Sequence, residues 1–378
     1  MTSTDPGRKS GTEVQLWGCG DASLGQLGPL LNGDVLVFLP IELQLQEMGL
    51  ADYHPRLICA SWQTTYIVLS CEGKSDRLMS MGSDDFGDLG IGKPKKKPIA
   101  PCCVKLGHLF IDGISLEDLH LVVLSIAAGQ HHVIVQLRIR LKDGTHRQIM
   151  LGWGTARHGE LGNVNNTSKK TSFLSLPQIL TNIDASEVTS FSLGNQHSTF
   201  LSESKRVFSI GSNKRGQANG LEQLGDVEYV DCTWNGTYIV KTEDPEGFTR
   251  IYATGNHSKG QLGRTLTSSD GIQSLAPVEL PPLSLPTHRL LELACGSEHV
   301  LALFSVQSDS GDAMMEPEVW GWGWNEHGNL GIDSTDDVHL PIKIWPSNHN
   351  PGPHIGTEVR AIDIWAGCGT SWIAVEVN

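Results

Sequence analysis

The chain has 378 residues, of which 42 are glycine and 39% are hydrophobic, and its formal net charge is −14. This composition is typical of a turn-rich β protein with a substantial core and excludes a disordered chain. The negative charge argues against general binding to nucleic acid or to an anionic membrane, since both require a basic surface. We therefore expect neither nucleic acid nor membrane as a direct partner.

The N-terminus and the cysteines indicate the compartment. The N-terminal sequence MTSTDPGRKSGTEVQ has no apolar signal-peptide core, and no apolar run is long enough to cross a bilayer. The eight cysteines are scattered, as expected for reduced, mostly buried thiols. The basic run GKPKKKP (92–98) is interpreted as a solvated loop, with a nuclear import signal or a phosphate contact as the alternatives. We expect a cytoplasmic protein, with the nucleus as a second compartment.

We predict a disordered N-terminal segment over residues 1–13 and a single domain over residues 14–378. The first predicted strand, VQLWG (14–18), leads into a glycine-rich turn whose spacing recurs along the chain. The template is one glycine, a second five positions later and a third three positions after that. Its first glycines are Gly20, Gly82, Gly154, Gly255 and Gly323, and a weaker copy starts at Gly211, with Asn219 in the third place.

Each copy of the template predicts a strand that enters a tight turn with positive φ. A phosphate-binding loop also has two glycines five apart, but it continues with Lys and then Ser or Thr. Here an acid or an amide follows the second glycine: Gln26, Asp88, Glu160, Gln217, Gln261 or Asn329. The template is therefore predicted to be scaffold, and six copies indicate a repeat architecture.

A second repeated element alternates with the template. Its clearest copies are AAGQHHVIV (127–135), SLGNQHSTFL (192–201) and ACGSEHVLAL (294–303), and its divergent copies are CASWQTTYIV (59–68), CTWNGTYIV (232–240) and AGCGTSWIAV (366–375). Each copy ends in a short apolar run typical of a buried strand. Short hairpins, such as the one at Asp143-Gly144, make consecutive runs antiparallel neighbours. Small antiparallel sheets repeated around an axis form a β-propeller.

The ends of the chain predict how the ring closes. The strand at Val14–Trp17 has no earlier partner, and the strand at Trp372–Val377 has no later one. Their pairing would complete one blade from both termini and remove two open sheet edges. Six templates predict six blades, and the short span from Gly211 to Thr233 predicts a trimmed blade around GLEQLGDVEYV.

The alternation of WGxGxxxxGxLG with ACGxxHxxxL, from Trp17 to Val375, resembles the regulator of chromosome condensation repeat. The resemblance implies an all-β protein, a β-propeller of the regulator of chromosome condensation type. The family normally has seven blades. With six repeats, either this chain closes with six blades, or its first blade is missing and the ring is open or strained.

Within the family, the divergent copies at 59–68 and 232–240 and the C-terminal repeat resemble the alpha-tubulin suppressor group of fungi. This resemblance implies a non-enzymatic scaffold without a cofactor. Such a scaffold forms a heterodimer with a small zinc-binding protein and supports diphthamide synthesis and Elongator-dependent tRNA wobble-uridine modification. Elongator itself is then a second expected partner.

Two other classes of function stay open. The family's founder is a guanine-nucleotide exchange factor for a Ran-like small GTPase, but it has a basic tail, where this chain has only Arg8 and Lys9. A propeller enzyme rests on fold analogy alone. The sequence has no G-x-S-x-G, H-E-x-x-H or EF-hand pattern, so we predict no catalytic, cofactor or metal residues.

Three histidines, His132, His197 and His299, hold equivalent positions and should therefore lie on different blades. We expect each to bond to the backbone of its own blade rather than to form a catalytic trio. The adjacent His131 is less constrained and free to face solvent.

The tryptophans fall into two groups. Those that precede template glycines or lie in the closing strand should be packing residues: Trp17, Trp153, Trp322 and Trp372. Those in predicted turns are either wedges between blades or anchors of an interface. The candidate partner-binding residues are these tryptophans and their polar neighbours: Trp62, Gln63, Trp234, Asn235, Trp324 and Glu326.

Overall fold

The computed structural model describes residues 13–92, 99–162, 172–212, 221, 225–242, 249–265, 275–280, 288–307, 314–347 and 359–377. The lysine run at 93–97 lies outside these ranges, as do residues 1–12 of the predicted disordered segment. Glu13, the last residue of that segment, is the first residue of strand β1 (Glu13–Asp21).

The described strands form six small antiparallel sheets, which we call blades 1 to 6. Blade 1 contains β3 (His54–Ala60), β4 (Thr64–Ser70), β5 (Arg77–Gly82) and β6 (Ile99–Cys103). Blade 2 contains β9 (His120–Ala128), β10 (His132–Arg140), β11 (His146–Thr155) and β12 (Phe173–Leu180). Blade 3 contains β13 (Val188–Leu193), β14 (His197–Ser202) and β15 (Val207–Gly211).

The second half of the ring follows the same plan. Blade 4 contains β16 (Tyr229–Thr233), β17 (Gly236–Thr242), β18 (Thr249–Gly255) and β19 (Ala276–Pro277). Blade 5 contains β20 (His288–Cys295), β21 (His299–Gln307), β22 (Met314–Gly323) and β23 (Val338–Trp345). Blade 6 combines β24 (Val359–Ala366) and β25 (Thr370–Val377) with β1 and β2 (Asp34–Pro40).

Additional short elements lie between blades 1 and 2. They are the hairpin of β7 (Phe110–Ile111) and β8 (Ile114–Ser115) and the 3-10 turn η1 (Leu116–Asp118). Within the described ranges, no helix is long and apolar enough to cross a membrane.

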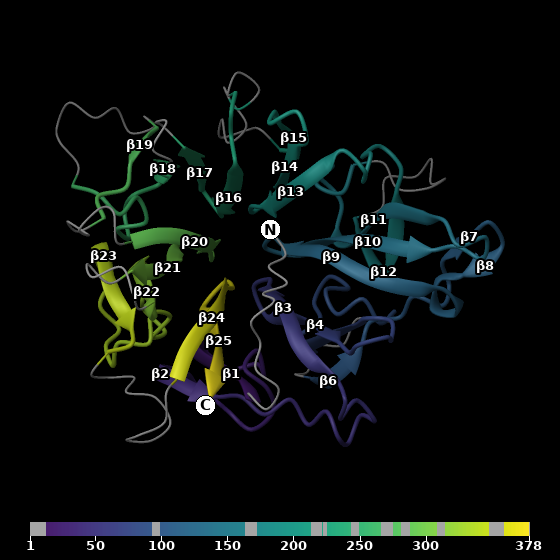
Figure 1. Ribbon diagram of the computed structural model, residues 1–378, viewed down its shortest axis with the longest axis horizontal. Coiled ribbons are helices and arrows are strands. Elements are labelled where there is room, and N and C mark those ends of the chain that lie inside the picture. The colour runs from purple at the N-terminus through teal and green to yellow at the C-terminus, as the bar shows by residue number, and fades with distance from the viewer. Residues whose placement is uncertain are drawn as a thin grey trace.

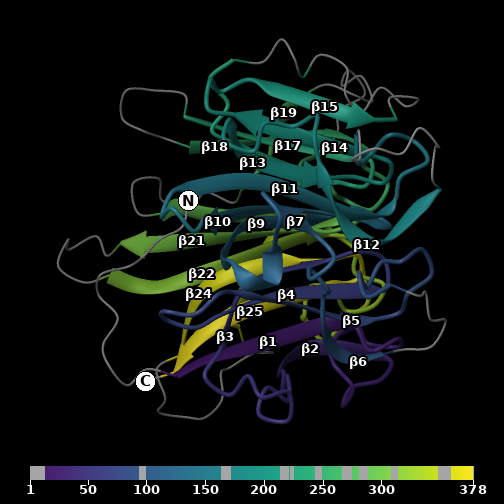
Figure 2. The ribbon, with the colours of Figure 1, turned by 90° about the vertical axis from the view of Figure 1, so that its right-hand side faces the viewer.

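The blades are arranged as a ring (Figure 1), and the first strand of each blade lies nearest the axis. These inner strands are β3, β9, β13, β16, β20 and β24. Seen from the side, the sheets stack one above another across the molecule (Figure 2). The predicted six-bladed β-propeller is therefore confirmed.

The ring is closed by the two ends of the chain, as predicted. Strand β1 pairs with β25 from Glu13↔Val377 to Gly20↔Thr370, and β24 and β2 flank this pair. The pairs Val14↔Glu376 and Trp17↔Ile373 have the predicted partners. Each terminal strand thus covers the edge that the other would expose.

Blade 3 is the trimmed blade. Among the described residues it has three strands, in the order β13-β14-β15, whereas each other blade has four. The chain runs from Gly211 at the end of β15 to Tyr229 at the start of β16, but from Gly154 to Val188 at the equivalent place in blade 2. Since a fourth strand and its turn must fit in that span, the short connection agrees with the three strands found among the described residues.

Apolar side chains fill the interfaces between neighbouring blades. Alternate side chains of each strand point to opposite faces of the sheet, and both faces are covered by the adjacent blades. Trp153 and Trp322 are fully buried, and their indole N–H groups donate to the carbonyls of Asp88 (2.7 Å) and Gln261 (2.8 Å). The packing role predicted for them is confirmed, as it is for Trp17 and Trp372, which are also buried.

The glycine turns are scaffold, as predicted. The second glycines have positive φ, for example 79° at Gly87 and 82° at Gly159. The side chain that follows is buried and accepts an N–H from two residues before it: Glu160 accepts from His158 (2.6 Å), and Gln261 accepts from Lys259 (2.8 Å). Gln26 and Asp88 accept from their own turns in the same way, whereas the Asn329 amide contacts the His299 ring (3.5 Å), and both arrangements agree with the predicted structural role.

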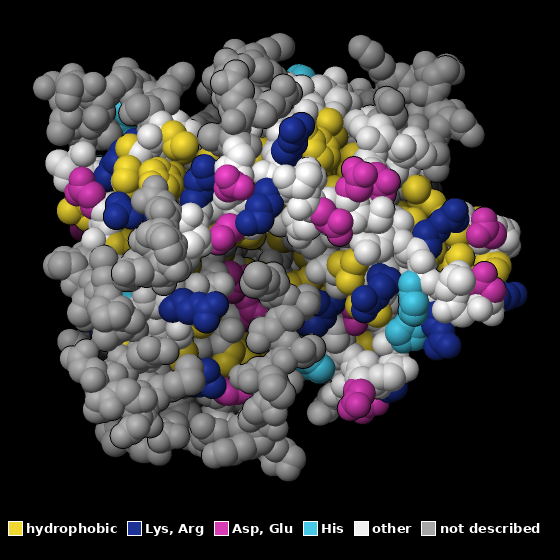
Figure 3. Space-filling view, turned by 45° about the horizontal axis from the view of Figure 1, so that its top comes forward, with side chains coloured by type: hydrophobic (Ala, Val, Ile, Leu, Met, Phe, Trp, Pro, Cys, Tyr) yellow, Lys and Arg dark blue, Asp and Glu magenta, His cyan; other side chains and the backbone are white. Residues whose placement is uncertain are grey.

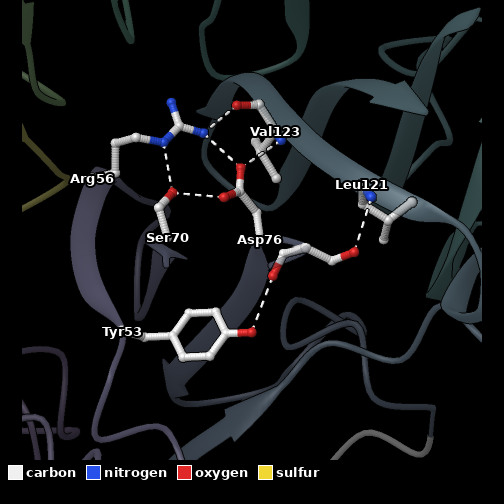
Figure 4. Close-up of polar contacts among 7 residues, drawn as sticks. Tyr53, Arg56, Ser70, Asp76, Leu121 and Val123 are labelled. Carbon is white, nitrogen blue, oxygen red and sulfur yellow. Dashed lines mark hydrogen bonds and ion pairs between the residues drawn. The ribbon is translucent and has the colours of Figure 1, made fainter. Parts of the chain in front are cut away.

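A polar clasp joins blades 1 and 2 (Figure 4). Asp76 accepts from the Arg56 guanidinium (2.8 Å), from the Ser70 hydroxyl (2.6 Å) and from the Val123 N–H (2.8 Å). Its own N–H donates to the carbonyl of Leu121 (3.0 Å). Because Val123 and Leu121 lie on β9, this carboxylate fixes the position of blade 2 against blade 1.

Candidate protein-binding face

One turn in each blade connects the inner strand to the second strand, and these six axial turns lie around the axis at one end of the ring. They comprise residues 61–63, 129–131, 194–196, 234–235, 296–298 and 367–369. The glycine turns reach the same end, because Gly82 pairs with Thr64 and Gly154 pairs with His132. Both repeated sequence elements therefore build this single face.

Backbone hydrogen bonds connect axial turns of neighbouring blades. The Trp62 N–H donates to the Gln130 carbonyl (3.0 Å), and the Gln130 N–H donates to Gly194 (3.4 Å). On the other side of the ring, the Trp234 N–H donates to Ser297 (2.8 Å), and the Ser297 N–H donates to Gly367 (3.1 Å). The axial turns are thus held by bonds that do not depend on side-chain identity.

The structure brings together two of the predicted anchors, Trp62 and Trp234. Trp62 lies in blade 1 and Trp234 in blade 4, which stand opposite each other in a six-bladed ring. Their rings stack across the axis with centroids 4.9 Å apart and an interplanar angle of 30°. Trp62 is nevertheless 42% exposed. The pair therefore covers the axis at this face and also presents aromatic surface to solvent.

Two further residues join this pair. His131 of blade 2 stacks on Trp62 (6.1 Å, 5°), and Phe86 packs against His131 (4.6 Å). Nδ1 of His131 also lies 3.7 Å from a carboxylate oxygen of Asp88. We call Trp62, Trp234, His131 and Phe86 the axial aromatic cluster. His131 was expected to be less constrained than His132 and free to face solvent, and Phe86 was missed because its turn matched the scaffold template.

Gln63 and Asn235 have a structural role through their backbones. The Gln63 carbonyl accepts from the Ser83 N–H (2.8 Å), and the Asn235 carbonyl accepts from the Asn256 N–H (3.1 Å). The last residue of every axial turn makes the equivalent bond, as His131 does with Thr155 (2.7 Å). Their half-buried side chains lie next to the cluster, so a role in orienting a partner stays a prediction.

Trp324 and Glu326 lie apart from the cluster, in the glycine turn of blade 5. The Trp324 indole donates to the Glu326 carboxylate (3.1 Å) and meets the His327 ring edge-to-face at 5.2 Å. His327 in turn contacts Asp34 of blade 6 (3.0 Å). The six predicted residues thus form two separate groups and not one site.

The three equivalent histidines lie on different blades, as predicted, but their bonding partners were predicted wrongly. Nε2 of His132 lies 3.1 Å from the Ser198 hydroxyl of the next blade, and His299 makes the same contact with Ser371 (3.0 Å). The side chains of His132 and His299 therefore join neighbouring blades, whereas both ring nitrogens of His197 are buried without a hydrogen-bond partner among the described residues. Burial lowers the pKa of His132 to about 3 and the pKa values of His197 and His299 to about 4. They are neutral at physiological pH.

A buried carboxyl group supports the strand that carries Trp234. Asp231 on β16 accepts from the Ser192 hydroxyl (2.6 Å) on β13 and from the Cys295 N–H (2.8 Å) on β20. It thus ties together the inner strands of three consecutive blades. Burial raises the pKa of Asp231 to about 6, against the opposite effect of these hydrogen bonds. This residue is a positioning group beneath the cluster.

A pair of inner-strand carboxyls, Glu292 and Asp363, lies on blades 5 and 6. Burial raises the pKa of Glu292 well above its usual range and also raises the pKa of Asp363, and the two side chains are hydrogen-bonded to each other. The Ile364 N–H donates to both carboxyls, at 3.3 and 3.2 Å. These groups join neighbouring inner strands.

Among the described residues, no group of three or more His, Cys, Asp or Glu side chains is arranged to hold a metal ion. The cysteines are free thiols; Cys19, Cys59, Cys232 and Cys368 are buried, while Cys103 is exposed. Burial raises the pKa of Cys232 and of Cys368 to about 12, so these thiols stay protonated.

Comparison with known proteins identifies the repeat. The family model described as "Regulator of chromosome condensation (RCC1) repeat" matches residues 150–201, 250–303 and 317–371, and a second model with that description matches residues 188–217. These segments contain residues of the glycine turns of blades 2, 3, 4 and 5 and the axial turns of blades 3, 5 and 6. The repeat assignment made from the sequence is thus supported.

The relatives extend the similarity along the chain. The secretion-regulating guanine nucleotide exchange factor of Bos taurus is 26% identical over 367 residues, covering 91% of this chain and 70% of that protein. An RCC1 repeat-containing protein of Schizosaccharomyces pombe is 25% identical over 386 residues, covering 97% of this chain and 86% of that protein.

Solved structures agree with the fold. Human WBSCR16 superposes with a TM-score of 0.60 at 17% identity and covers 96% of this chain and 98% of its own. Prp20p of Saccharomyces cerevisiae gives a TM-score of 0.60 at 15% identity, with 97% and 92% covered. At these identities the likeness concerns the architecture alone.

Proposed function

Because the chain is a β-propeller of the regulator of chromosome condensation type, we propose that it is a non-enzymatic scaffold that binds a small zinc-binding protein through its axial aromatic cluster. The observation that supports this is the stack of Trp62 and Trp234, which leaves Trp62 42% exposed. Large aromatic side chains held on a rigid backbone are the usual energetic centres of protein interfaces. The bonded axial turns supply that rigidity.

The partner follows from the resemblance of the two tryptophan-bearing repeats to the alpha-tubulin suppressor group. On this proposal the heterodimer serves diphthamide synthesis and Elongator-dependent tRNA wobble-uridine modification, in the cytoplasm and, as a second compartment, in the nucleus. An enzymatic role has little support in the described residues, since the three repeated histidines are buried, neutral and on separate blades.

The experiment is titration of the full chain with the recombinant small zinc-binding protein. We expect Trp62→Ala and Trp234→Ala each to weaken binding by at least about 2 kcal/mol, roughly thirtyfold in Kd, because each removes half of the stacked pair. The melting temperature should change little, since the backbone bonds of the axial turns stay intact. Circular dichroism should also lose the signal of two coupled indoles in either variant.

Matched controls separate the two predicted groups of residues. Phe110→Ala removes a 59% exposed aromatic side chain on the β7–β8 hairpin and should leave affinity unchanged. Trp324→Ala tests the second group and should weaken binding only if the interface extends to blade 5. If both Trp62→Ala and Trp234→Ala bind as tightly as the wild type, the cluster is not the interface.

The alternative is a guanine-nucleotide exchange factor for a Ran-like small GTPase. It is favoured by the bovine relative, whose name states that activity. The test is release of a fluorescent guanine nucleotide from a purified Ran-like GTPase in the presence of this chain. Acceleration of release together with no affinity for the zinc-binding protein would replace the leading proposal with this one.

A further inference from the structure

Blade 3 differs from the other blades at its outer edge. Among the described residues its last strand is β15, and no fourth strand covers it. In the other five blades a fourth strand forms the outer edge, and each of these strands contains a proline: Pro40, Pro101, Pro177, Pro277 and Pro341. Proline cannot donate a backbone hydrogen bond, so it protects an edge strand against pairing. The sequence of β15, VFSIG, has no proline.

The backbone of β15 is available for pairing. The bond from the Ser202 N–H to the Arg206 carbonyl (2.9 Å) makes these residues a hydrogen-bonded pair. Hydrogen-bonded and non-hydrogen-bonded pairs alternate along antiparallel strands. The next pair, Leu201↔Val207, is therefore not hydrogen-bonded, and the alternation continues along β15. Val207, Ser209 and Gly211 therefore direct their N–H and C=O groups away from β14. In the described part of the chain these outward groups have no hydrogen-bond partner.

The glycine turns show that no described residue occupies the place of the fourth strand beside Gly159. A Cβ atom added to Gly87 would lie 2.5 Å from the Cα of Ser175, on the fourth strand of the next blade. The equivalent atom on Gly260 would lie 2.6 Å from His339, and that on Gly328 would lie 2.8 Å from Leu36. Gly159 of blade 2 faces blade 3, and a Cβ there would meet nothing within 4 Å.

Apolar and basic side chains line this slot. Phe208 and Ile210 of β15 are half-buried and pack toward blade 2, so an added strand would cover them. At the start of β15, Lys205 and Arg206 are exposed and have no ion pair with any described residue. Figure 3 brings the top of the ring forward and shows Lys and Arg side chains on a surface that also carries acids. The cations beside the slot favour an acidic occupant.

From these observations we propose that blade 3 binds an extended, acidic segment of a partner protein, which adds to β15 as an antiparallel fourth strand. Main-chain hydrogen bonds to Val207, Ser209 and Gly211 supply the affinity, and alternate side chains of the segment pack on Phe208 and Ile210. Carboxylates that flank the segment pair with Lys205 and Arg206. This site is separate from the axial aromatic cluster and does not depend on its function.

The test uses the full chain and a fluorescent synthetic peptide of alternating Val and Thr with paired Glu at both ends, measured by anisotropy. We expect Ser209→Pro to weaken binding at least about tenfold, because it removes an outward N–H and places a ring against the added strand. Ser209→Ala is the matched control, since it loses the hydroxyl contact with Thr199 (2.9 Å) but keeps the backbone N–H. It should bind as the wild type does.

A separate experiment tests the contribution of the surface charges to binding. The double variant Lys205→Glu and Arg206→Glu should bind the Glu-flanked peptide more weakly and should bind a Lys-flanked version better. The double variant, measured with both peptides, keeps the proposal testable if Ser209→Pro fails to fold. Equal binding of the peptide by Ser209→Pro and Ser209→Ala, or no binding by the wild type, would overturn the proposal. A concentration-dependent dimer that Ser209→Pro abolishes would also overturn it, since the occupant would then be a second copy of the chain.

Discussion

The junction between blades 1 and 2 and the junction between blades 2 and 3 are built from the same repeat but differ in one strand. At the first junction, the fourth strand of blade 2 lies against Gly87, and Trp153 donates to the Asp88 carbonyl (2.7 Å). At the second, no described residue lies within 4 Å of a Cβ added at Gly159, and Ile210 holds the position that Trp153 holds in blade 2. Both junctions nevertheless hold their blades in the same ring.

Polar side chains join the two blades at the second junction, as His299 and Ser371 do between blades 5 and 6. The Ser198 hydroxyl donates to the Glu160 carbonyl (2.8 Å), which occupies the place of the Asp88 carbonyl, and His132 contacts the same hydroxyl (3.1 Å). A large indole with its N–H is thus replaced by a serine and a histidine. The comparison shows that the inner part of a blade junction can be maintained without its outer strand.

Removal of residues 371–378 should have the largest effect on stability. It removes a central strand of blade 6, whereas blade 3 lacks only an outer strand among the described residues. The deletion takes away Trp372, Ile373 and Val375, which are fully buried, and leaves β1 and β24 without their shared partner. Open edges on both sides of the ring expose unpaired backbone groups. We expect loss of cooperative thermal unfolding, measured by circular dichroism. A truncated chain that melts like the intact one would show that the terminal strands do not close the ring.

The next largest effect is expected from substitution of the equivalent residues Trp153 and Ile210, which should destabilise the two junctions to different extents. Trp153→Ala should lower the free energy of unfolding by about 3 to 5 kcal/mol, since it removes a fully buried indole and its hydrogen bond. Ile210→Ala should cost less, about 1 to 2 kcal/mol, because Ile210 is only half-buried. Chemical denaturation gives both values. Equal costs would mean that blade 3 is packed as tightly as blade 2.

The sequence predicted the features that depend on repetition. The spacing of the glycines gave the six blades, and unpaired strands at the two ends gave the closure, because each rests on a local pattern that every copy shares. The short span after Gly211 likewise predicted the trimmed blade. The tryptophans before template glycines were predicted to be buried for the same reason, and Trp153 and Trp322 are.

Contacts between distant residues could not be predicted in this way. The stack of Trp62 on Trp234 depends on the blades being opposite, and the bond from His132 to Ser198 depends on which faces meet between blades. Neither contact can be read from the residue spacing within one repeat. Phe86 was missed for a related reason, since its position in a scaffold turn gives no sign of the neighbouring His131.

Acidification should weaken the second junction more than the first. The pKa of His132 is about 3 in the folded chain, below its ordinary value of 6.5, because burial disfavours the charged form. Below pH 6.5 the unfolded chain binds a proton that the folded chain does not, so the free energy of unfolding falls as the pH drops from 6.5 toward 3. Each such histidine contributes a slope of up to about 1.4 kcal/mol per pH unit. Blade 1 has Thr64 at the equivalent position.

The variants His132→Gln and Asp231→Asn should change this slope in opposite directions. His132→Gln should make stability less sensitive to acid between pH 6.5 and 4. Asp231 has a folded pKa of about 6, above its ordinary 3.8, so it adds stability as the pH falls through that interval. Asp231→Asn should therefore increase the acid sensitivity. Denaturant melts at a series of pH values provide the measurement, and an unchanged slope in His132→Gln would contradict the buried, neutral histidine.

The smallest effect is expected at Gly159, which we compare with the equivalent glycine of the first junction, Gly87. Both have positive φ, 79° at Gly87 and 82° at Gly159, so alanine is strained at either position by about 1 kcal/mol. At Gly159 that strain is the whole cost, because the added Cβ meets nothing within 4 Å. At Gly87 the Cβ would lie 2.5 Å from the Ser175 backbone, which must move, so the cost should exceed about 2 kcal/mol. Denaturation of the two alanine variants measures the difference directly. If Gly159→Ala were as destabilising as Gly87→Ala, the slot beside blade 3 would be filled, and the two junctions would be alike.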